Sequence, residues 1–279
     1  MTLTAPLPSD VEEEAPPPSG TAEVRRGGWF VRITILVVVI LWLIPTVGVL
    51  ITSFRPEQQV ETTGWWTAFA HVFESGQWTL QNYRDALDAG GFENAFLNSL
   101  AVTIPSTVMP ITIAAFAAYA FSWMEFRGRY VMFVAVVALL VVPLQMALIP
   151  ILQLYSNGAE IGGVPIVPDL DLNGTFLGIW LAHTAFGLPL AVYLLRNFIG
   201  ALPSSIIESA RVDGADHFTI FWRLVVPLSV PALAAFAIFQ FLWVWNDLLV
   251  ARIFLGATEE NRVLTLALQT LNGSRGEDW

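Results

Sequence analysis

The 279-residue sequence contains neither cysteine nor lysine, and each absence excludes a class of site. Without cysteine, the chain forms no disulfides and no thiolate metal sites. Without lysine, it cannot build a P-loop, because the lysine of that motif reaches the nucleotide phosphates. If ATP drives this protein, a separate chain must bind the nucleotide. We predict no cofactor, metal or nucleic acid bound to this chain.

Familiar catalytic motifs are also missing. The three histidines, His71, His183 and His217, lie far apart in the sequence, and neither H-E-x-x-H nor G-x-S-x-G occurs. The sequence therefore predicts a protein that is not an enzyme.

Apolar residues are abundant and make up 55% of the chain. Several apolar runs exceed the roughly 20 residues that a helix needs to cross a hydrocarbon core of about 30 Å. We therefore predict an all-α, multispanning helical membrane protein. The five predicted spans are residues 29–51, 95–123, 130–155, 174–198 and 224–249.

Residues 1–28 differ from the rest in composition. Proline, glutamate, serine and threonine are frequent there, and no periodic apolar face is present. Such a segment cannot offset the entropy lost on ordering, so we predict a disordered, acidic, cytoplasmic tail.

Arginines near the predicted spans indicate which ends face the cytoplasm. They flank the first span, the loop after the second and the segment after the fourth: Arg25, Arg26, Arg32, Arg127, Arg129, Arg196, Arg211 and Arg223. By the positive-inside rule, these segments and the amino terminus are cytoplasmic. The chain is then a multi-pass protein of the cell membrane.

Residues 29–94 hold the first span and an external segment rich in aromatics. Trp65, Trp66 and Trp78 have two interpretations. They could stack on sugar faces, or they could lie at the membrane interface or in a small packed cap. We favour the second interpretation.

Gln145 and His183 are two of the polar residues within the predicted spans. Gln145 stands between Pro143 and Pro150, and spans kinked by proline often border a cavity. Gln145 is therefore a candidate pathway residue, with an interhelical hydrogen bond as the alternative. His183 has no evident carboxylate partner, which favours a packed hydrogen-bonding group over a proton relay.

A charged segment separates the fourth and fifth spans. Ser205 and Glu208 have the spacing of a capping box, and Gly214 lies where a helix would end in the left-handed region. The apolar face between them consists of Ile206, Ile207 and Ala210. The pattern predicts a short helix that either docks on a soluble protein or lies at the level of the lipid headgroups.

This segment also resembles a known motif. Glu208-Ser209-Ala210, three residues, Gly214, nine residues and Leu224-Val225-Val226-Pro227 resemble the EAA loop, E-A-A-x3-G-x9-I-x-L-P, of permease subunits of ATP-binding-cassette importers. Ser209, Leu224 and Val226 depart from the pattern by small or apolar replacements. The resemblance implies a coupling helix seated in a cytoplasmic ATPase dimer. The implied contact residues are Glu208, Ser209, Ala210, Asp213, Gly214 and Ala215.

Further stretches resemble the carbohydrate branch of these importers, which includes maltose-type permeases. Asn98-Ser99-Leu100 resembles the opening of the transmembrane domain. The Trp-Asn-Asp run at 245–247 makes Asn246 and Asp247 candidate pathway residues, although an acid there could simply reach interfacial water. Residues 265–273 resemble the last external loop. The implied contacts with a solute-binding protein are Gln269, Asn272 and Gly273.

By this resemblance, residues 95–279 are a type-1 transmembrane domain that works with three partners: a second permease subunit, an ATPase dimer and an external solute-binding protein. The family has six spans, and five are visible here, because no sixth apolar segment follows the fifth span. The implied function is import of a carbohydrate, either an oligosaccharide or a glucoside. Import of a polyamine or another small solute is one alternative. A membrane scaffold or enzyme with an interfacial loop helix is another.

Overall fold

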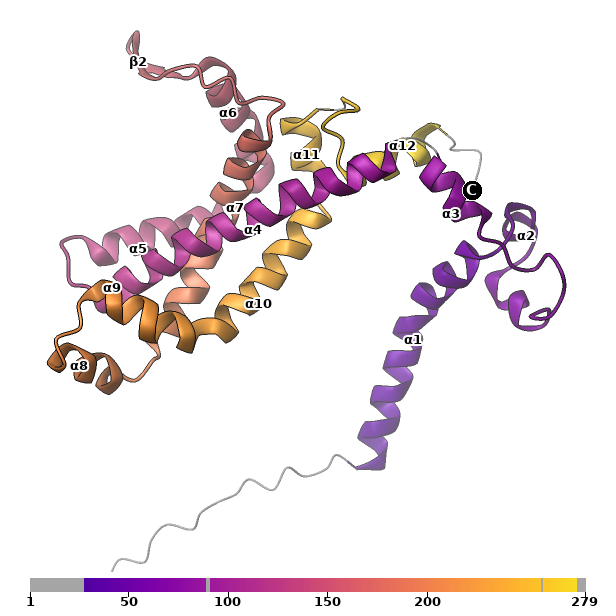
Figure 1. The fold of residues 1–279 in the computed structure, drawn as a ribbon, viewed down its shortest axis with the longest axis horizontal. Coiled ribbons are helices and arrows are strands. Elements are labelled where there is room, and N and C mark those ends of the chain that lie inside the picture. Colours follow the sequence, from indigo (N-terminus) through magenta and orange to yellow (C-terminus); the bar gives the residue numbers. More distant parts are fainter. Residues whose placement is uncertain (1–27, 89–90, 257, 275–279) are drawn as a thin grey trace, which may run out of the picture. The chain divides into compact units, whose positions relative to one another are not determined.

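The computed structural model describes residues 28–88, 91–256 and 258–274 (Figure 1). The predicted disordered tail lies outside these residues, apart from Gly28. The chain divides into two compact units, one ending at Trp78 and the other beginning at Thr79. The predicted division at residue 95, which follows the motif resemblance, stays a prediction.

The first unit contains one long helix and a small cap. Its elements are α1 (Trp29–Ser53), α2 (Glu57–Thr62) and the 3-10 helix η1 (Trp65–Phe69). Gly48 is the buried residue of α1, and the rest of the helix is exposed or half-buried. A Cβ atom at Gly48 would lie 2.9 Å from Trp65 Nε1, so glycine lets η1 pack closely against this helix.

The second unit is built around three long helices. These are α4 (Phe92–Trp123), α7 (Phe176–Gly200) and α10 (Val226–Trp245). Small side chains allow α4 to approach its neighbours, since Ala114 and Ala118 are fully buried. The other elements are α3 (Gln81–Asp88), α5 (Arg129–Ala138), η2 (Leu139–Val141), α6 (Leu144–Asn157), β1 (Ala159–Ile161), β2 (Val164–Val167), α8 (Ser204–Val212), α9 (His217–Ile220), η3 (Phe221–Val225), α11 (Leu249–Phe254) and α12 (Leu264–Ser274).

Hydrogen bonds fix the relative directions of the three long helices. Trp180 Nε1 donates to Ala101 O at one end of the α4–α7 pair, and Trp123 Nε1 donates to Ile199 O at the other. These helices are therefore parallel. Gln240 Nε2 donates to Ser106 O, and Phe221 stacks on Phe116, so α10 runs antiparallel to α4. The directions agree with those predicted for the second, fourth and fifth spans.

Within the described part of the chain, four helices are long and apolar enough to span a membrane, and a bent pair makes a fifth candidate. The predicted all-α, multispanning class is confirmed. The third predicted span, however, is not one helix, because residues 129–141 and 144–157 meet at 106°. Pro143 explains the break: it precedes α6, and Val142 before it is extended, as proline favours.

The fifth span begins earlier than predicted. Its helix starts at His217, seven residues before the predicted start at Leu224, and passes through a π-helical turn, η3. Arg223, next to the apolar run that begins at Leu224, marks the membrane entry in the sequence. Ile220, Phe221 and Val225 are buried, and this apolar face keeps the stretch helical against the core.

The external loop predicted between the third and fourth spans contains a short antiparallel hairpin. Strand β1 pairs with β2, with Ile161 opposite Val164. Gly162 and Gly163 form the two-residue turn, and both have positive φ angles, as a tight hairpin turn requires.

Candidate functional site

The charged segment between the fourth and fifth spans forms α8, but its start differs from the prediction. Pro203 precedes the helix, and no side chain caps this end among the described residues. The predicted capping box of Ser205 and Glu208 is therefore wrong. The helix begins at Ser204, so Ser205 is already inside it, and its carbonyl accepts a hydrogen bond from Ser209 Oγ at 2.7 Å.

The end of α8 is the one that the sequence predicts. Gly214 adopts φ +82°, which costs glycine little. Gly214 N donates to Arg211 O at 3.0 Å, and Ala215 N donates to Ala210 O at 2.9 Å. These two bonds form a Schellman motif, which satisfies the last carbonyls of the helix and turns the chain away.

The six predicted coupling residues lie together in this helix and turn, but some are exposed and others pack against the core. Glu208, Ser209, Asp213 and Gly214 are exposed. Ala210 and Ala215 are half-buried and pack against the apolar cluster that includes the buried Ile207. The small size of Ala210 therefore allows the core of its own chain to approach. A shallow open groove runs beside the helix, lined by Ser205, Ile206, Ser209, Ala210, Asp213 and Leu224.

Two contacts join this segment to the end of α4. Arg211 Nη2 donates to Trp123 O at 2.9 Å, and the Tyr119 hydroxyl lies 2.9 Å from His217 Nδ1. Both contacts cross about ninety residues of sequence, so no local pattern could have revealed them.

Asp216 caps the helix that follows the turn. It accepts a hydrogen bond from Thr219 N at 2.8 Å. The side-chain and backbone hydrogen bonds of Thr219 hold the pKa of the exposed Asp216 carboxyl below its usual range. An aspartate placed just before a helix is an N-cap signal that sequence reasoning could have used.

The opposite end of the three-helix core holds the candidate residues Asn246 and Asp247. Asn246 Nδ2 donates to Leu242 O at 2.7 Å, so its amide folds back onto α10. Asp247 carboxylate oxygens accept from Val250 N at 3.3 Å and Ala251 N at 2.9 Å, in the first turn of α11. Both side chains are therefore engaged within the chain itself.

His183 is not the lone histidine that the sequence indicates. Its Nε2 lies 3.8 Å from Asp247 Oδ2, and its side chain is 1% exposed. The two residues line a cavity of about 10 Å³, close to the volume that one water molecule needs. Gln145 is not among the residues that line this cavity. It is exposed in the first turn of α6, beside the break in the third span.

The predicted last external loop is largely the helix α12, which packs over this same end of the core. Asn98 Nδ2 donates to Glu260 O at 2.8 Å, and Ser99 Oγ accepts from Leu264 N at 2.7 Å. Gln269 is exposed, with Oε1 3.5 Å from Arg252 Nη1. The side chains of the other two predicted contacts, Asn272 and Gly273, lie outside the described part.

Comparisons with known proteins show what this chain is similar to. Residues 98–275 match the family described as "Binding-protein-dependent transport system inner membrane component". The chain is 55% identical to the osmoprotective compounds uptake permease protein GgtD of Synechocystis sp., over 89% of this chain and 80% of that protein. It is 42% identical to the alpha-glucoside transport system permease protein AglG of Rhizobium meliloti, over 90% of this chain and 88% of that protein. The diacetylchitobiose uptake system permease protein NgcG of Streptomyces coelicolor is 28% identical over 86% of this chain and 74% of that protein.

Proposed function

We propose a function that proceeds from one fact: the chain belongs to the family of binding-protein-dependent transport system inner membrane components. In this proposal it is the permease subunit of an ATP-binding-cassette importer and forms a translocation pathway with a second permease subunit. A separate ATPase dimer supplies the energy, and an external binding protein delivers the solute.

The observation that carries the proposal is the construction of α8. Glu208 and Ser209 in the helix and Asp213 just after it are exposed on the protein surface. Ile207 is only 1% exposed and packs against the core. Arg211 ties the same helix to the end of α4. A protein that grips the exposed face can therefore move two spans together. Such a partner acts by binding one conformation more tightly than the other, which shifts the populations of the two.

The arginines support a cytoplasmic location for this end. Arg127 and Arg129 follow the end of α4, and Arg196 lies near the end of α7. Arg211 lies in α8, and Arg223 lies in η3. By the positive-inside rule, the end that carries α8 faces the cytoplasm, as does the amino terminus of α1. The end that carries α12 then faces the binding protein, with Gln269, Asn272 and Gly273 as candidate contacts.

The proposed solute is a carbohydrate, with glucosides favoured over longer oligosaccharides. The names of two relatives, an alpha-glucoside transport permease and a diacetylchitobiose uptake permease, support this class. The osmoprotective compounds named for a third relative support a second candidate, another small solute carried by the same architecture. Gln145, Asn246 and Asp247 stay candidate pathway residues in either case.

The test is assembly and turnover of the full-length complex. The chain is co-expressed with its candidate permease, ATPase and binding-protein partners, purified through a tag on this chain and reconstituted in vesicles. We expect the ATPase to co-purify and its hydrolysis to rise when binding protein and a glucoside are added together. Absence of the ATPase from a folded full-length preparation would instead favour a scaffold whose α8 lies on the membrane surface.

A further inference from the structure

Residues 54–78 form a cap after α1 in which a charged side chain is buried and aromatic side chains are exposed. The buried charged side chain is Arg55, which is only 2% exposed. Arg55 Nη1 donates to Gly64 O at 3.0 Å, and Nη2 donates to Thr63 Oγ1 at 2.6 Å. The guanidinium thus holds the turn that leads into η1 against the end of the helix.

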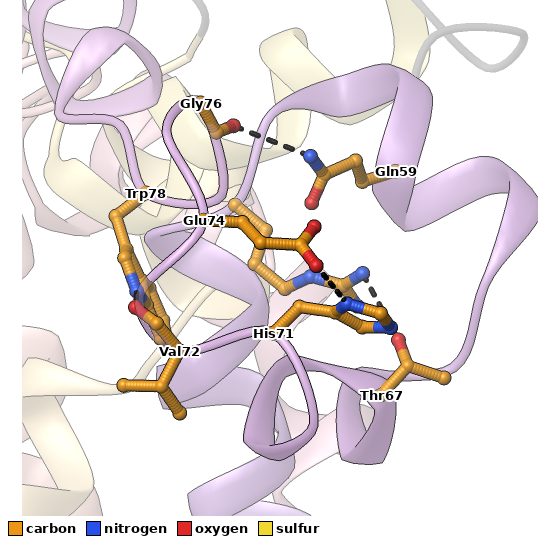
Figure 2. Close-up of polar contacts among 8 residues, drawn as sticks. Gln59, Thr67, His71, Val72, Glu74, Gly76 and Trp78 are labelled. Carbon is orange, nitrogen blue, oxygen red and sulfur yellow. Dashed lines mark hydrogen bonds and ion pairs between the residues drawn. The ribbon is translucent and has the colours of Figure 1, made fainter.

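Polar contacts also fix the loop after η1, as Figure 2 shows. Gln59 Nε2 donates to Gly76 O at 3.2 Å, and Trp78 Nε1 donates to Val72 O at 2.8 Å. His71 Nδ1 lies 2.6 Å from Glu74 Oε1. These contacts fix the backbone of the cap, so its exposed side chains are held in defined positions.

The surface that the cap presents is aromatic. Phe73 is fully exposed at 101%, Trp66 is 64% exposed and Phe69 is 63% exposed. Two more large apolar side chains of the cap are partly exposed: Val72 and Trp78. A cluster of this kind on a soluble surface marks a place where something apolar binds.

The position of the cap along α1 identifies what covers it. Trp65 packs on Gly48, which lies five residues, or about 7.5 Å of helix, before the end of α1 at Ser53. The whole helix is 25 residues, or about 37 Å, against a hydrocarbon core of about 30 Å. The cap therefore folds back beside the last turns of α1, at the depth of the headgroups and the first acyl carbons.

We propose that residues 64–73 are an interfacial anchor that rests on the bilayer. Trp66, Phe69 and Phe73 insert among the headgroups on the side where α1 ends, continuous with the lipid-exposed surface of that helix. Tryptophan prefers this zone because its ring is apolar while its N–H can still reach water. The anchor would fix the height and tilt of α1, and a Trp66 inserted in the bilayer would not be available to stack on a sugar.

This chain has no cysteine, so an introduced cysteine is its only one, and the partner subunits are used in cysteine-free form. Single variants Trp66→Cys, Phe69→Cys and Phe73→Cys are spin-labelled in the complete complex, in phosphatidylcholine and phosphatidylglycerol vesicles. Collision rates with oxygen, which partitions into lipid, and with a water-soluble nickel chelate are then compared. Gln58→Cys, exposed on α2, is the aqueous control, and Trp42→Cys, 83% exposed in the middle of α1, is the lipid control.

We expect the three anchor positions to show oxygen-to-nickel ratios several-fold above Gln58→Cys and approaching Trp42→Cys. Ratios equal to that of Gln58→Cys would overturn the proposal. Poor access to both reagents would show a protein partner on this face, and nickel access lost only when binding protein is added would show a docking site; each would also overturn it.

A second measurement avoids labelled variants. Fluorescence quenching by brominated lipids is compared between the wild-type complex and Trp66→Phe. We expect the difference signal to be quenched most by bromines placed near the headgroups. Quenching that is equal for both proteins, at every bromine depth, would contradict an interfacial position for Trp66.

Discussion

His183 Nε2 and Asp247 Oδ2 lie 3.8 Å apart and join the middle of α7 to the turn that follows α10. Trp243 packs edge-on against the same imidazole, with ring centroids 6.2 Å apart. Thr265 Oγ1 donates to Asp247 O at 2.6 Å, which links the start of α12 to the pair. One buried histidine and one aspartate therefore connect three segments at the end of the core opposite α8.

Replacing Asp247 with alanine should destabilise this end. The variant loses both hydrogen bonds to the first turn of α11, and loss of a helix cap costs about 1 kcal/mol. The melting temperature of the purified protein in detergent should fall. Asp247→Asn keeps an oxygen acceptor for one of the two amides and should fall less. Equal melting temperatures for Asp247→Ala and wild type would contradict the structural role of this carboxylate.

Gly187 and Gln240 form a matched pair between α7 and α10. A Cβ atom at Gly187 would lie 2.7 Å from Gln240 Oε1, and Gln240 is completely buried. Gly187→Ala should therefore displace the amide that donates to Ser106 O and destabilise the protein by about 1–3 kcal/mol. Combining it with Gln240→Ala should recover part of that loss, because the clash is then gone. Additive effects in a double-mutant cycle, measured by unfolding, would refute the coupling.

Substitutions of Gly214 test the turn that ends α8. Proline fixes φ near −65° and removes the N–H that donates to Arg211 O, so Gly214→Pro cannot form the observed motif. We expect solute-stimulated ATP hydrolysis by the reconstituted complex to be abolished. Asparagine tolerates the left-handed region, so Gly214→Asn should retain most of it. Normal stimulation in the proline variant would count against coupling through this segment.

Glu208 tests the exposed face of the same helix. Its carboxylate faces outward, so Glu208→Ala should leave folding intact and weaken retention of the ATPase during detergent washing. Glu259→Ala removes the same charge from a 92% exposed residue at the opposite end of the core and should retain the ATPase normally. Indistinguishable retention of the ATPase in the two variants would show that Glu208 makes no specific contact.

Much of the fold could be predicted from composition and local pattern. Long apolar runs identify the spans because few other segments of this length avoid charge, and Gly214 identifies the end of α8 because few residues adopt its φ. The predicted helix boundaries were wrong where tertiary packing determines where a helix begins. Residues 217–223 were placed before the predicted span, yet the buried Ile220 and Phe221 hold them helical against α4.

The candidate site was predictable only in part, for a similar reason. The EAA-like spacing places the six predicted coupling residues in one short segment, which the structure forms as α8 and the turn after it; their role stays a prediction. The partners of that segment, Tyr119 and Trp123, and the partner of His183 come from distant helices. Local sequence patterns do not predict these contacts, because they depend on how α4, α7 and α10 pack.

The π-helical turn at Phe221–Val225 has a consequence for the whole fifth span. A π turn is a one-residue insertion in an α-helix, and one residue corresponds to about 100° of rotation. The wider turn absorbs that residue, so the helix beyond it keeps its orientation. Rewinding the same residues as a regular α-helix would instead rotate the far half by about 100° and move the Gln240 amide away from Ser106 O. The orientation of the far half of this span thus depends on the π turn that follows α8 and α9.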